Sequence, residues 1–443
     1  MRTPLALALG TVAIAGSLVA ASRLPDRPLA DGSIAFTNVN VVPMDEEQVL
    51  KDQTVLVRNG RIAAIGSSEM VVPSGATRVD GTGKYLMPGL AEMHGHMPGG
   101  DIEETVMFLY VANGVTTVRG MLGEDQHMAL RARANSGQIV APTLYMAGPS
   151  FSGNSVDSPA QAEAKVRLQK NQGWDLLKVH PGLTVPEYDA MAMTAHEVGI
   201  RFGGHVPADV GLAHAIEMGQ ETFDHLDGFI EALDGFEKPI DRGRLTQLVR
   251  SVKSAGAWVV PTMVLWDVGI LGRGDAAEMS AYPEMRYWYK TGGGNSIEGW
   301  TQRQLARAAE RTPATQVWAA NRDQVLKALS DGGVGILMGT DSPQIFSVPG
   351  FSLHREMQAM ADAGMTTWEI LASGTRDVGV YFQRNDTFGT VAVGRRADLL
   401  LLNSNPLENV ANVADRAGVM VRGRWIPESE IQERLAEIEA RFN

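Results

Sequence analysis

Residues 86–96 read Leu-Met-Pro-Gly-Leu-Ala-Glu-Met-His-Gly-His, and they contain the first strand of the predicted larger domain. The apolar run 90–93 is typical of a buried strand, and it leads directly into His94 and His96. Barrel enzymes place their active sites at the carboxyl ends of their strands, so both imidazoles are expected at such a mouth. A His-x-His pair is a weak signal alone, and its value depends on what the rest of the chain supplies.

Seven more apolar runs follow, and helix-compatible segments such as 160–172, 185–198 and 245–255 separate them. The runs are residues 115–118, 143–146, 176–179, 200–203, 221–224, 258–261 and 335–338. Strand and helix that alternate eight times predict an α/β fold, a (β/α)8 TIM barrel over residues 86–384.

The crossover before the last of these strands is long. Residues 265–320 hold several aromatic side chains and the run Gly292-Gly293-Gly294. Loops of this length are uncommon unless they cover something, so we expect a partly helical lid insertion over the barrel mouth. A helical hairpin without a catalytic part is the equally weighted alternative.

Strand patterns flank the barrel on both sides. Residues 34–42, 54–58 and 61–65 alternate, and Asn59-Gly60 between the last two runs is a hairpin signal, because both residues tolerate positive φ. Residues 389–394, 397–402 and a hairpin around Arg422-Gly423 follow the barrel. We therefore expect a small β-sandwich domain built from residues 34–85 and 385–426, and then a charged C-terminal helix over residues 427–443.

Residues 1–22 have the layout of a signal peptide: a basic start, an apolar small-residue run, and the small-residue end Val19-Ala20-Ala21-Ser22. They predict export to the periplasm or secretion, with no stable membrane span once the signal is removed. A single membrane anchor is the alternative, but a span needs about 20 strongly apolar residues and this run is short and rich in Ala and Gly.

Composition excludes several kinds of partner and site. The chain has 51 acidic and 39 basic residues, a net charge of -12, which repels phosphate backbones and argues against nucleic-acid binding. It has no cysteine, so disulfides and thiolate metal sites are excluded. Any metal must be held by histidine, carboxylate or a less usual ligand. A homo-oligomer is compatible with the sequence, which does not specify one.

Further polar groups follow other predicted strands in the same way as the first histidine pair. Apolar strands that end in His or Lys are hard to explain by packing, because a buried lysine is costly without a partner. The groups expected to converge on one rim are His94, His96, Lys178, His205, His225 and Asp341.

These motifs together resemble the amidohydrolase superfamily, in its imidazolonepropionase-like and prolidase-like branch, which includes ochratoxin-hydrolysing amidohydrolases. The resemblance spans the chain from residues 86–96 through Gly339-Thr340-Asp341 to Gly394-Arg395-Arg396-Ala397-Asp398-Leu399. It implies two divalent metal ions, of which zinc is the expected kind, bridged by a Lys178 carbamylated with CO2. His94, His96 and Asp341 would hold the more buried ion, and His205 and His225 the other.

The resemblance also implies a reaction. A hydroxide that bridges the metals would attack an amide carbonyl, while Asp341 takes its proton and passes it to the leaving amine. The expected substrate is a small molecule with an amide or peptide bond: a dipeptide, an N-acyl amino acid or an amide-linked toxin such as ochratoxin. Alternatives are a lactonase, esterase or cyclic-amide hydrolase on the same site, and a non-catalytic interaction protein, which the complete set of ligands disfavours.

The remaining histidines and the lid give weaker hypotheses. His180 follows Lys178 closely and is a candidate catalytic residue that contacts substrate, with a locally bonded loop histidine as the alternative. It stands in His180-Pro181-Gly182, where many relatives carry a Gly-rich sequence. His354 is a candidate neighbour of the site or a helix cap. His127, His196 and His214 are expected to be structural, and Arg286, Tyr287 and Tyr289 are candidates for gripping a substrate carboxylate.

Overall fold

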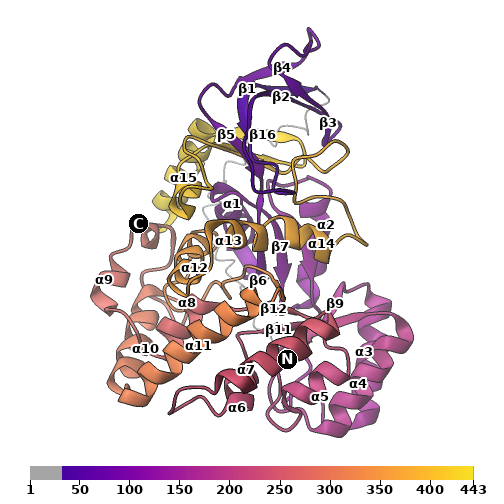
Figure 1. Ribbon diagram of the computed structural model, residues 1–443, viewed down its shortest axis with the longest axis vertical. Helices are drawn as coiled ribbons and strands as arrows, with labels where there is room; N and C mark the ends of the chain where they lie inside the picture. The colour runs from indigo at the N-terminus through magenta and orange to yellow at the C-terminus, as the bar shows by residue number, and fades with distance from the viewer. Residues whose placement is uncertain (1–31, 443) are drawn as a thin grey trace, which may run out of the picture.

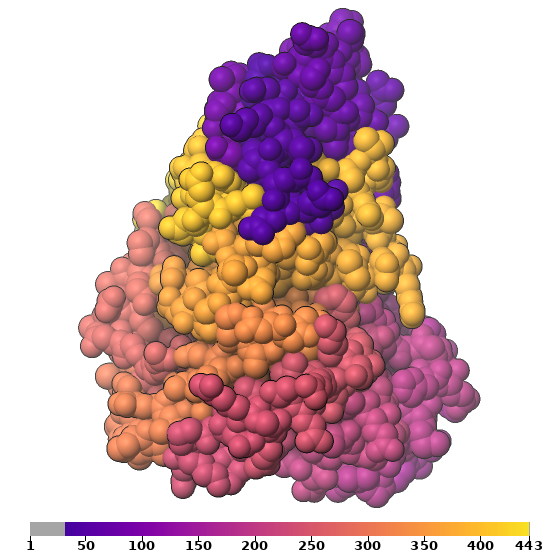
Figure 2. Space-filling model, viewed as in Figure 1, coloured from indigo at the N-terminus to yellow at the C-terminus, as the bar shows by residue number. Residues whose placement is uncertain are grey.

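The computed structural model describes residues 32–442, so the predicted signal at residues 1–22 lies outside the described residues. A sheet of early strands stands at one end of the molecule, with the C-terminal helix beside it, and the helices and strands of the larger part lie below (Figure 1). The space-filling view shows the same arrangement, in which the N-terminal sheet contacts the last segments of the chain (Figure 2).

Strands from both ends of the chain form one eight-stranded mixed sheet, here called the terminal sheet. Its order is β16-β15-β14-β5-β1-β2-β3, with β4 paired to β1, and the two chain ends meet where β14 pairs antiparallel with β5. The predicted joining of both ends is confirmed at this pairing. The strands are β1 (Ile34–Val41), β2 (Leu50–Arg58), β3 (Arg61–Ser67), β4 (Thr77–Asp80), β5 (Tyr85–Pro88), β14 (Leu399–Leu402), β15 (Arg416–Val421) and β16 (Arg424–Pro427).

The strand predicted at residues 389–394 is wrong, because this segment forms bends and turns. Gly389 and Gly394 both have positive φ, 87° and 85°, which takes the backbone out of the extended region at each end. A Cβ on Gly389 would lie 2.5 Å from the carbonyl oxygen of Thr375. The segment lies against the terminal sheet, where Val391 packs into the apolar core of the sheet and the N–H of Gly394 donates to Ile62 O of β3 at 2.8 Å.

All eight strands predicted for the larger part are present, and they form two parallel sheets. One has the order β6-β7-β8 and the other β13-β12-β11-β10-β9. Parallel strands joined by helices are typical of α/β folds. The strands are β6 (Leu90–Gly95), β7 (Val115–Gly120), β8 (Thr143–Met146), β9 (Leu176–Val179), β10 (Arg201–Gly204), β11 (Thr222–Asp224), β12 (Trp258–Val260) and β13 (Gly335–Ile336).

Hydrogen bonds join the edges of these two sheets at both sides. Beyond β8, Ala147 bridges Leu176 of β9 in parallel. Beyond β13, the backbone of Met338 accepts a bond of 2.9 Å from the N–H of Met93 in β6. The three-stranded and five-stranded sheets therefore contact one another along both pairs of edges.

The predicted helices 160–172, 185–198 and 245–255 are present, and each ends at a glycine in the left-handed conformation, as a C-terminal cap requires. None of the helices in the described chain has the length and apolarity that a membrane span needs. The helices are α1 (Glu103–Ala112), α2 (Asp125–Asn135), α3 (Pro159–Gln172), α4 (Val185–Val198), α5 (Gly211–Glu217), α6 (Phe229–Leu233), α7 (Arg242–Ala255), α8 (Met263–Leu265), α9 (Ala276–Ser280), α10 (Ile297–Ala309), α11 (Pro313–Asp331), α12 (Phe351–Asp362), α13 (Thr367–Ser373), α14 (Arg376–Tyr381) and α15 (Glu428–Phe442), with the short helical turns η1 (Gly100–Ile102), η2 (Trp266–Ile270, a π-helix), η3 (Pro283–Tyr287) and η4 (Val410–Ala414).

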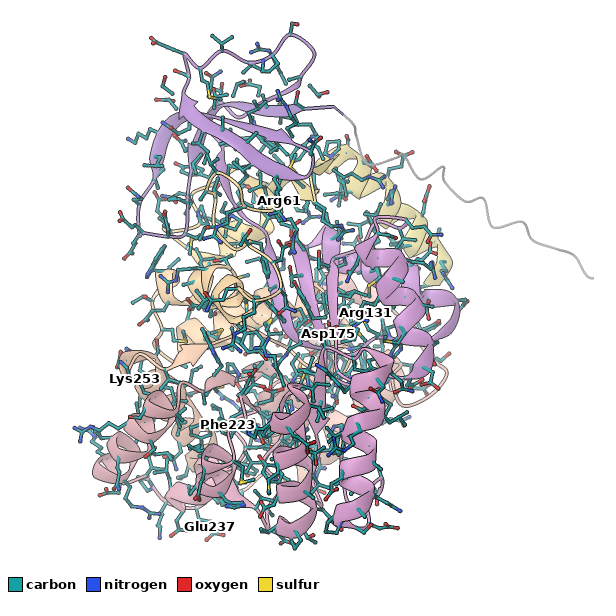
Figure 3. The ribbon with its side chains drawn as sticks, turned by 90° about the vertical axis from the view of Figure 1, so that its right-hand side faces the viewer. Arg61, Arg131, Asp175, Phe223, Glu237 and Lys253 are labelled. Carbon is teal, nitrogen blue, oxygen red and sulfur yellow. The ribbon has the colours of Figure 1, made fainter. Side chains whose placement is uncertain are left out.

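Helices and strands are held together by apolar packing and by a few ion pairs that cross between elements. Phe223 of β11 is fully buried in the main apolar core. Arg131 of α2 lies beside Asp175, with its Nη1 2.6 Å from the carboxylate, and so ties this helix to the start of β9 (Figure 3).

A buried arginine connects the terminal sheet to the parallel strands. Arg396, 7% exposed, donates from Nε to Asp398 and from Nη1 to Asp386, both at 2.6 Å, and from Nη2 to Thr117 of β7 at 2.9 Å. A buried charge of this kind is stable only because its partners compensate the loss of water.

We predict that Arg396→Met destabilises the protein by about 3–5 kcal/mol, because it leaves Asp398 buried without its cation. Urea unfolding monitored by circular dichroism measures the change. Arg78→Met, at an exposed position of β4, is the matched control and should stay within about 0.5 kcal/mol. Equal stability of the two variants would contradict the linking role of Arg396.

Candidate metal centre

The carboxyl ends of the parallel strands bring the six predicted metal ligands into one cluster. His94 lies in β6 and Lys178 in β9, and the other four residues follow directly after β6, β10, β11 and the segment beyond β13. In the cluster, the ring centroids of His94 and His225 are 4.5 Å apart, and those of His205 and His225 are also 4.5 Å apart. Its members are His94, His96, Lys178, His205, His225 and Asp341.

Asp341 and Lys178 connect the histidines. The Oδ1 atom of Asp341 lies 2.6 Å from Nε2 of His96 and 3.8 Å from Nε2 of His94. The Nζ atom of Lys178 lies 3.1 Å from the same His94 nitrogen, and Oδ2 of Asp341 is 3.7 Å from Nε2 of His225. Nitrogen and oxygen atoms from four different strand ends therefore face a common centre.

The donor set fits a divalent cation. One ligand atom each from His94, His225 and Asp341 lie within 4.8 Å of one another, and all three residues are buried. Nε2 of His225 is buried and has no hydrogen-bond partner within residues 32–442, although an unpaired polar atom in the interior is costly. Imidazole nitrogens and a carboxylate oxygen at such a point are ligands that zinc accepts.

Burial sets the protonation of the two innermost histidines. It lowers the pKa of both His94 and His225 well below the ordinary value, and the nearby basic groups lower it further. Neutral imidazole is the form that binds a metal ion. For Asp341, burial alone acts to raise the pKa, but His94 and His96 outweigh it and hold the pKa well below its usual range.

Lys178 is fully buried, and the two glycines of β10 let that strand lie between β9, which carries the lysine, and β11. Burial lowers the pKa of its amine to about 8. A Cβ on Gly204 would lie 3.0 Å from Cδ of Lys178 and 2.5 Å from the carbonyl oxygen of Val179, and Gly204 has φ 125°. Gly203 likewise faces the Thr222 hydroxyl, which a Cβ would approach to 2.2 Å. The Gly-Gly pair before His205 thus allows β10 to pass close to the lysine.

Two histidines of the cluster are oriented by partners on their Nδ1 atoms. Nδ1 of His205 is 2.6 Å from Oδ2 of Asp227, and Nδ1 of His225 is 2.8 Å from the hydroxyl of Thr262. When Nδ1 carries the proton in such a pair, Nε2 has a free lone pair that points to the metal.

A buried ion pair supports the third histidine from below. Nδ1 of His94 lies 2.8 Å from Asp224, whose carboxylate also accepts from the fully buried guanidinium of Arg119 at 3.2 Å. Arg119 in turn donates to the main-chain oxygen of Met93 at 2.6 Å. These contacts fix His94 relative to both β7 and β11.

Glu92 joins the first strand of the cluster to the last. Its Oε1 accepts from the N–H groups of His94 at 2.9 Å and Thr340 at 2.8 Å, and its Oε2 accepts from the Thr340 hydroxyl at 2.6 Å. Burial raises the pKa of Glu92 to about 8. A single side chain thereby sets the distance between His94 and the residue before Asp341.

The backbone is strained at several points of the cluster. His225, Thr262 and Asp341 have φ of 66°, 43° and 61°, in the left-handed region that non-glycine residues rarely adopt. Such conformations cost about 1–3 kcal/mol each and persist where a functional arrangement requires them. Each of the three either belongs to the predicted ligand set or contacts a member of it.

A cavity of about 550 Å³ opens beside the cluster. His96 and Gln344 form one wall, and Gln344 donates to Asp341 at 2.8 Å. Trp288 and Tyr289, which belong to the long crossover, also line it. Part of the segment predicted as a lid therefore borders the space in front of the cluster.

Of the three residues suggested for gripping a carboxylate, only Tyr289 lines this cavity. Arg286 lies 3.8 Å from Glu439 of α15 and borders a different hollow. Tyr287 is buried and stacks on Phe351, with ring centroids 5.3 Å apart. Location along the chain was not enough to separate them.

His180 lies at the cluster, with its ring 4.9 Å from that of His205, and burial lowers its pKa to about 3.

His354 is bonded instead to Asn113, at 3.3 Å. The other histidines have local partners. Nδ1 of His127 accepts from the N–H of Glu124 at 3.1 Å, Nε2 of His196 lies 2.8 Å from Met218 O, and Nε2 of His214 lies 2.6 Å from Asp189.

The sequence analysis missed the residues that orient the ligands, namely Glu92, Arg119, Asp224, Asp227 and Thr262. Signals for some of them were present. Arg119 is a charge inside the apolar strand β7, and Asp224-His225-Leu226-Asp227 places two carboxylates beside a predicted ligand. Charged groups at positions that should be buried are typical of functional clusters.

The sequence profile of the amidohydrolase family matches residues 85–426. The chain belongs to the amidohydrolase family. Its predicted resemblance is thereby confirmed, and the predicted enzyme class, a hydrolase of carbon–nitrogen bonds, is confirmed at the level of the family.

Two similar proteins are named enzymes. Enamidase from Eubacterium barkeri is 30% identical over 175 residues, 35% of this chain, and the match spans 45% of the enamidase, less than half its length. Imidazolonepropionase from Stenotrophomonas maltophilia (strain R551-3) is 24% identical over 402 residues, 83% of this chain and 90% of that protein.

Solved structures share the fold. A Xaa-Pro dipeptidase with bound methionine in the active site has a TM-score of 0.68 at 18% identity, over 89% of this chain and 100% of the other. The A. niger ochratoxinase has a TM-score of 0.65 at 18% identity, over 89% and 96%. At 18% identity, both likenesses concern the fold.

We predict that Asp227→Asn lowers the affinity for zinc about 10- to 100-fold, because His205 loses the carboxylate that orients it. Titration of the metal-free protein, with bound zinc counted by elemental analysis, measures this. Asp189→Asn is the matched control, since Asp189 pairs with His214 at the same distance of 2.6 Å but away from the cluster. Equal zinc affinity in both variants would remove His205 from the ligand set.

Proposed function

We propose that this chain is a metal-dependent amidohydrolase that cleaves an amide or peptide bond in a small molecule. The observation that carries the proposal is the convergence of His94, His225, Asp341 and Lys178 on one buried centre, with Nε2 of His225 unpaired within the described chain. Membership of the amidohydrolase family supports the same chemistry.

We propose that the site holds two divalent ions and that both are zinc. His94, His96 and Asp341 would hold one, and His205 and His225 the other, with Lys178 as a carbamate between them. The close approach of Lys178 Nζ to His94 Nε2, 3.1 Å, supports a lysine that takes part in the centre. Ions bound here would lower the pKa of water and polarise a carbonyl.

Asp341 is the residue that we propose to move the proton. Its carboxylate faces three histidines and is held ionised by His94 and His96, so it accepts the proton of the attacking water. It then delivers that proton to the nitrogen of the departing amine as the carbon–nitrogen bond breaks, and a carboxylic acid and an amine are released. Gln344, which donates to Oδ1 at 2.8 Å, keeps the carboxylate in one orientation during both transfers.

His180 is proposed as a group that contacts substrate, because its ring lies beside His205 at the rim of the cluster. Its lowered pKa leaves it neutral at pH 7, so it would donate or accept a hydrogen bond rather than supply a charge. A dipeptide, an N-acyl amino acid or an amide-linked toxin such as ochratoxin is the proposed substrate range, with a lactone, ester or cyclic amide as the second candidate. The similarity to an imidazolonepropionase favours keeping that second candidate in the tests.

The proposal includes the architecture that would support this site. Hydrogen bonds along both edges of the parallel sheets support a closed (β/α)8 barrel over residues 86–384. The cavity wall formed by Trp288 and Tyr289 supports a lid at 265–320. The β-sandwich at residues 34–85 and 385–426, and export directed by residues 1–22, complete the proposed organisation.

We predict that Asp341→Asn lowers kcat at least about 100-fold, because the amide cannot accept and return a proton. Elemental analysis should find zinc still bound, since the four histidines of the centre and Lys178 remain. Steady-state kinetics on the best amide substrate measures the loss. Full activity in a zinc-loaded Asp341→Asn protein would exclude this residue as the proton carrier.

Removal of the metal tests the proposal as a whole. A chelator should abolish hydrolysis of a panel of N-acyl amino acids, Xaa-Pro dipeptides and lactones, and added zinc should restore it, because neither the water nor the carbonyl is activated without the ions. Chelator-resistant activity on any member would overturn metal dependence. Activity confined to lactones would replace the amidase by the second candidate.

A further inference from the structure

The cavity beside the candidate centre has the size of a substrate pocket. Its volume of about 550 Å³ lies in the usual range for small-molecule sites, about 300–1,000 Å³. One wall is His96 and Gln344, which contact Asp341, and the other is the crossover segment with Trp288 and Tyr289. A molecule cleaved at the centre would extend one of its ends into this space.

The described lining of the cavity has a negatively charged side chain and no lysine or arginine to balance it. No lysine or arginine lines it in the described chain, and its one carboxylate is Glu124, at the start of α2. The Glu124 carboxylate accepts a hydrogen bond from the side-chain amide of Gln126. Because this amide is neutral, the contact does not neutralise the negative charge of Glu124. The net charge of the whole chain, -12, has the same sign and adds to the local field.

Three polar donors of the wall are already used within the protein. Nε1 of Trp288 donates to Asn295 O at 2.6 Å, the Ser296 hydroxyl donates to Gly293 O at 2.7 Å, and Nε2 of Gln344 donates to Asp341. Binding a carboxylate in a pocket requires a cation or several free donors to offset its lost hydration. In the described chain this wall supplies no lysine or arginine, and the three donors named above are already bonded within the protein.

We infer that the part of the substrate that enters this cavity is uncharged or cationic and largely apolar, and that a carboxylate there is rejected. The inference rests on the proposed hydrolase function and narrows its substrate range. Met97, Ile102 and Leu122 supply apolar contact area, and Trp288 and Tyr289 supply aromatic surface. An aromatic or aliphatic amide, or one that carries an amino group, meets these walls better than an anionic one.

Two matched series of amides test the charge preference on each side of the cleaved bond. The first compares the p-nitroanilides of succinic acid, butyric acid and β-alanine, whose acyl ends are anionic, neutral and cationic. The second compares N-acetylphenylalanine with N-acetylphenethylamine, which lacks the carboxylate. In at least one series, the anionic member should have a kcat/KM about tenfold or more below its neutral partner, a difference of about 1.4 kcal/mol.

The result separates two kinds of failure. If the metal-loaded enzyme hydrolyses no amide of either series, nor any of the panel above, the proposed function fails. If it hydrolyses them and the anionic members are equal or better in both series, the function stands and the inference about charge is overturned.

Glu124→Gln tests the source of the rejection. Glutamine keeps an acceptor oxygen for the first turn of α2 but removes the negative charge. The ratio of kcat/KM between neutral and anionic substrates should fall at least about threefold in this variant, because the nearest repelling charge is gone. Glu69→Gln, at an exposed turn of the terminal sheet, is the control and should keep the wild-type ratio. An unchanged ratio in Glu124→Gln would contradict the role of this carboxylate.

Gly294→Leu tests whether the substrate enters this cavity at all. Gly294 lines the cavity, does not have positive φ, and a Cβ built on it meets nothing within 4 Å, so a larger side chain fits the fold and fills the space instead. The variant should raise KM for a bulky amide such as N-acetylphenethylamine more than for acetamide. Gly75→Leu, equally open and exposed but in the terminal sheet region, should change neither value. Equal kinetics for Gly294→Leu and wild type would place the substrate elsewhere.

Discussion

The structure depends on a group of basic side chains at the carboxyl ends of the parallel strands, of which Lys178, His94 and His225 are buried. Lys178 and three histidine rings lie within contact distance of one another, at a place where each would be costly to charge. Two features stabilise this group of basic side chains. Burial keeps His94 and His225 neutral, and carboxylates, above all Asp224 and Asp341, face the charges that remain. Much of the surrounding polar network serves to hold this balance.

The network explains why residues far apart in the sequence depend on one another. Glu92 holds the first parallel strand to the segment after the last one through hydrogen bonds. Arg119 connects β6 to β11 through Asp224. Gly204 lets β10 approach Lys178 without a clash, and Gly203 lets it approach Thr222 of β11. The ligand positions are therefore set by contacts between strands, while the backbone strain at His225 and Asp341 is the local cost of pointing both side chains inward.

The sequence predicted the parallel strands well, because buried runs such as 143–146 and 176–179 have a clear apolar pattern, and the structure gives these two the same bounds. It also selected six residues that the structure places in one cluster, since a lysine or histidine that follows an apolar strand has few structural explanations. The residues that orient the histidines, such as Asp227 and Thr262, were not predicted, because each has this role only through a residue that is near it in space. Residues 389–394 misled for a local reason: their β-branched composition indicates a strand, whereas the glycines at each end turn the chain.

The shared terminal sheet constrains the order in which the protein folds. β5 leaves the sheet just before the first parallel strand, and its partner β14 is synthesised only after the last one. During synthesis, β1 to β5 must wait with one edge unpaired until nearly the whole chain has emerged, and unpaired edges are sites of aggregation. Contacts between such distant segments are also slow to form. We therefore expect the newly synthesised chain to need a chaperone until β14, β15 and β16 have been synthesised.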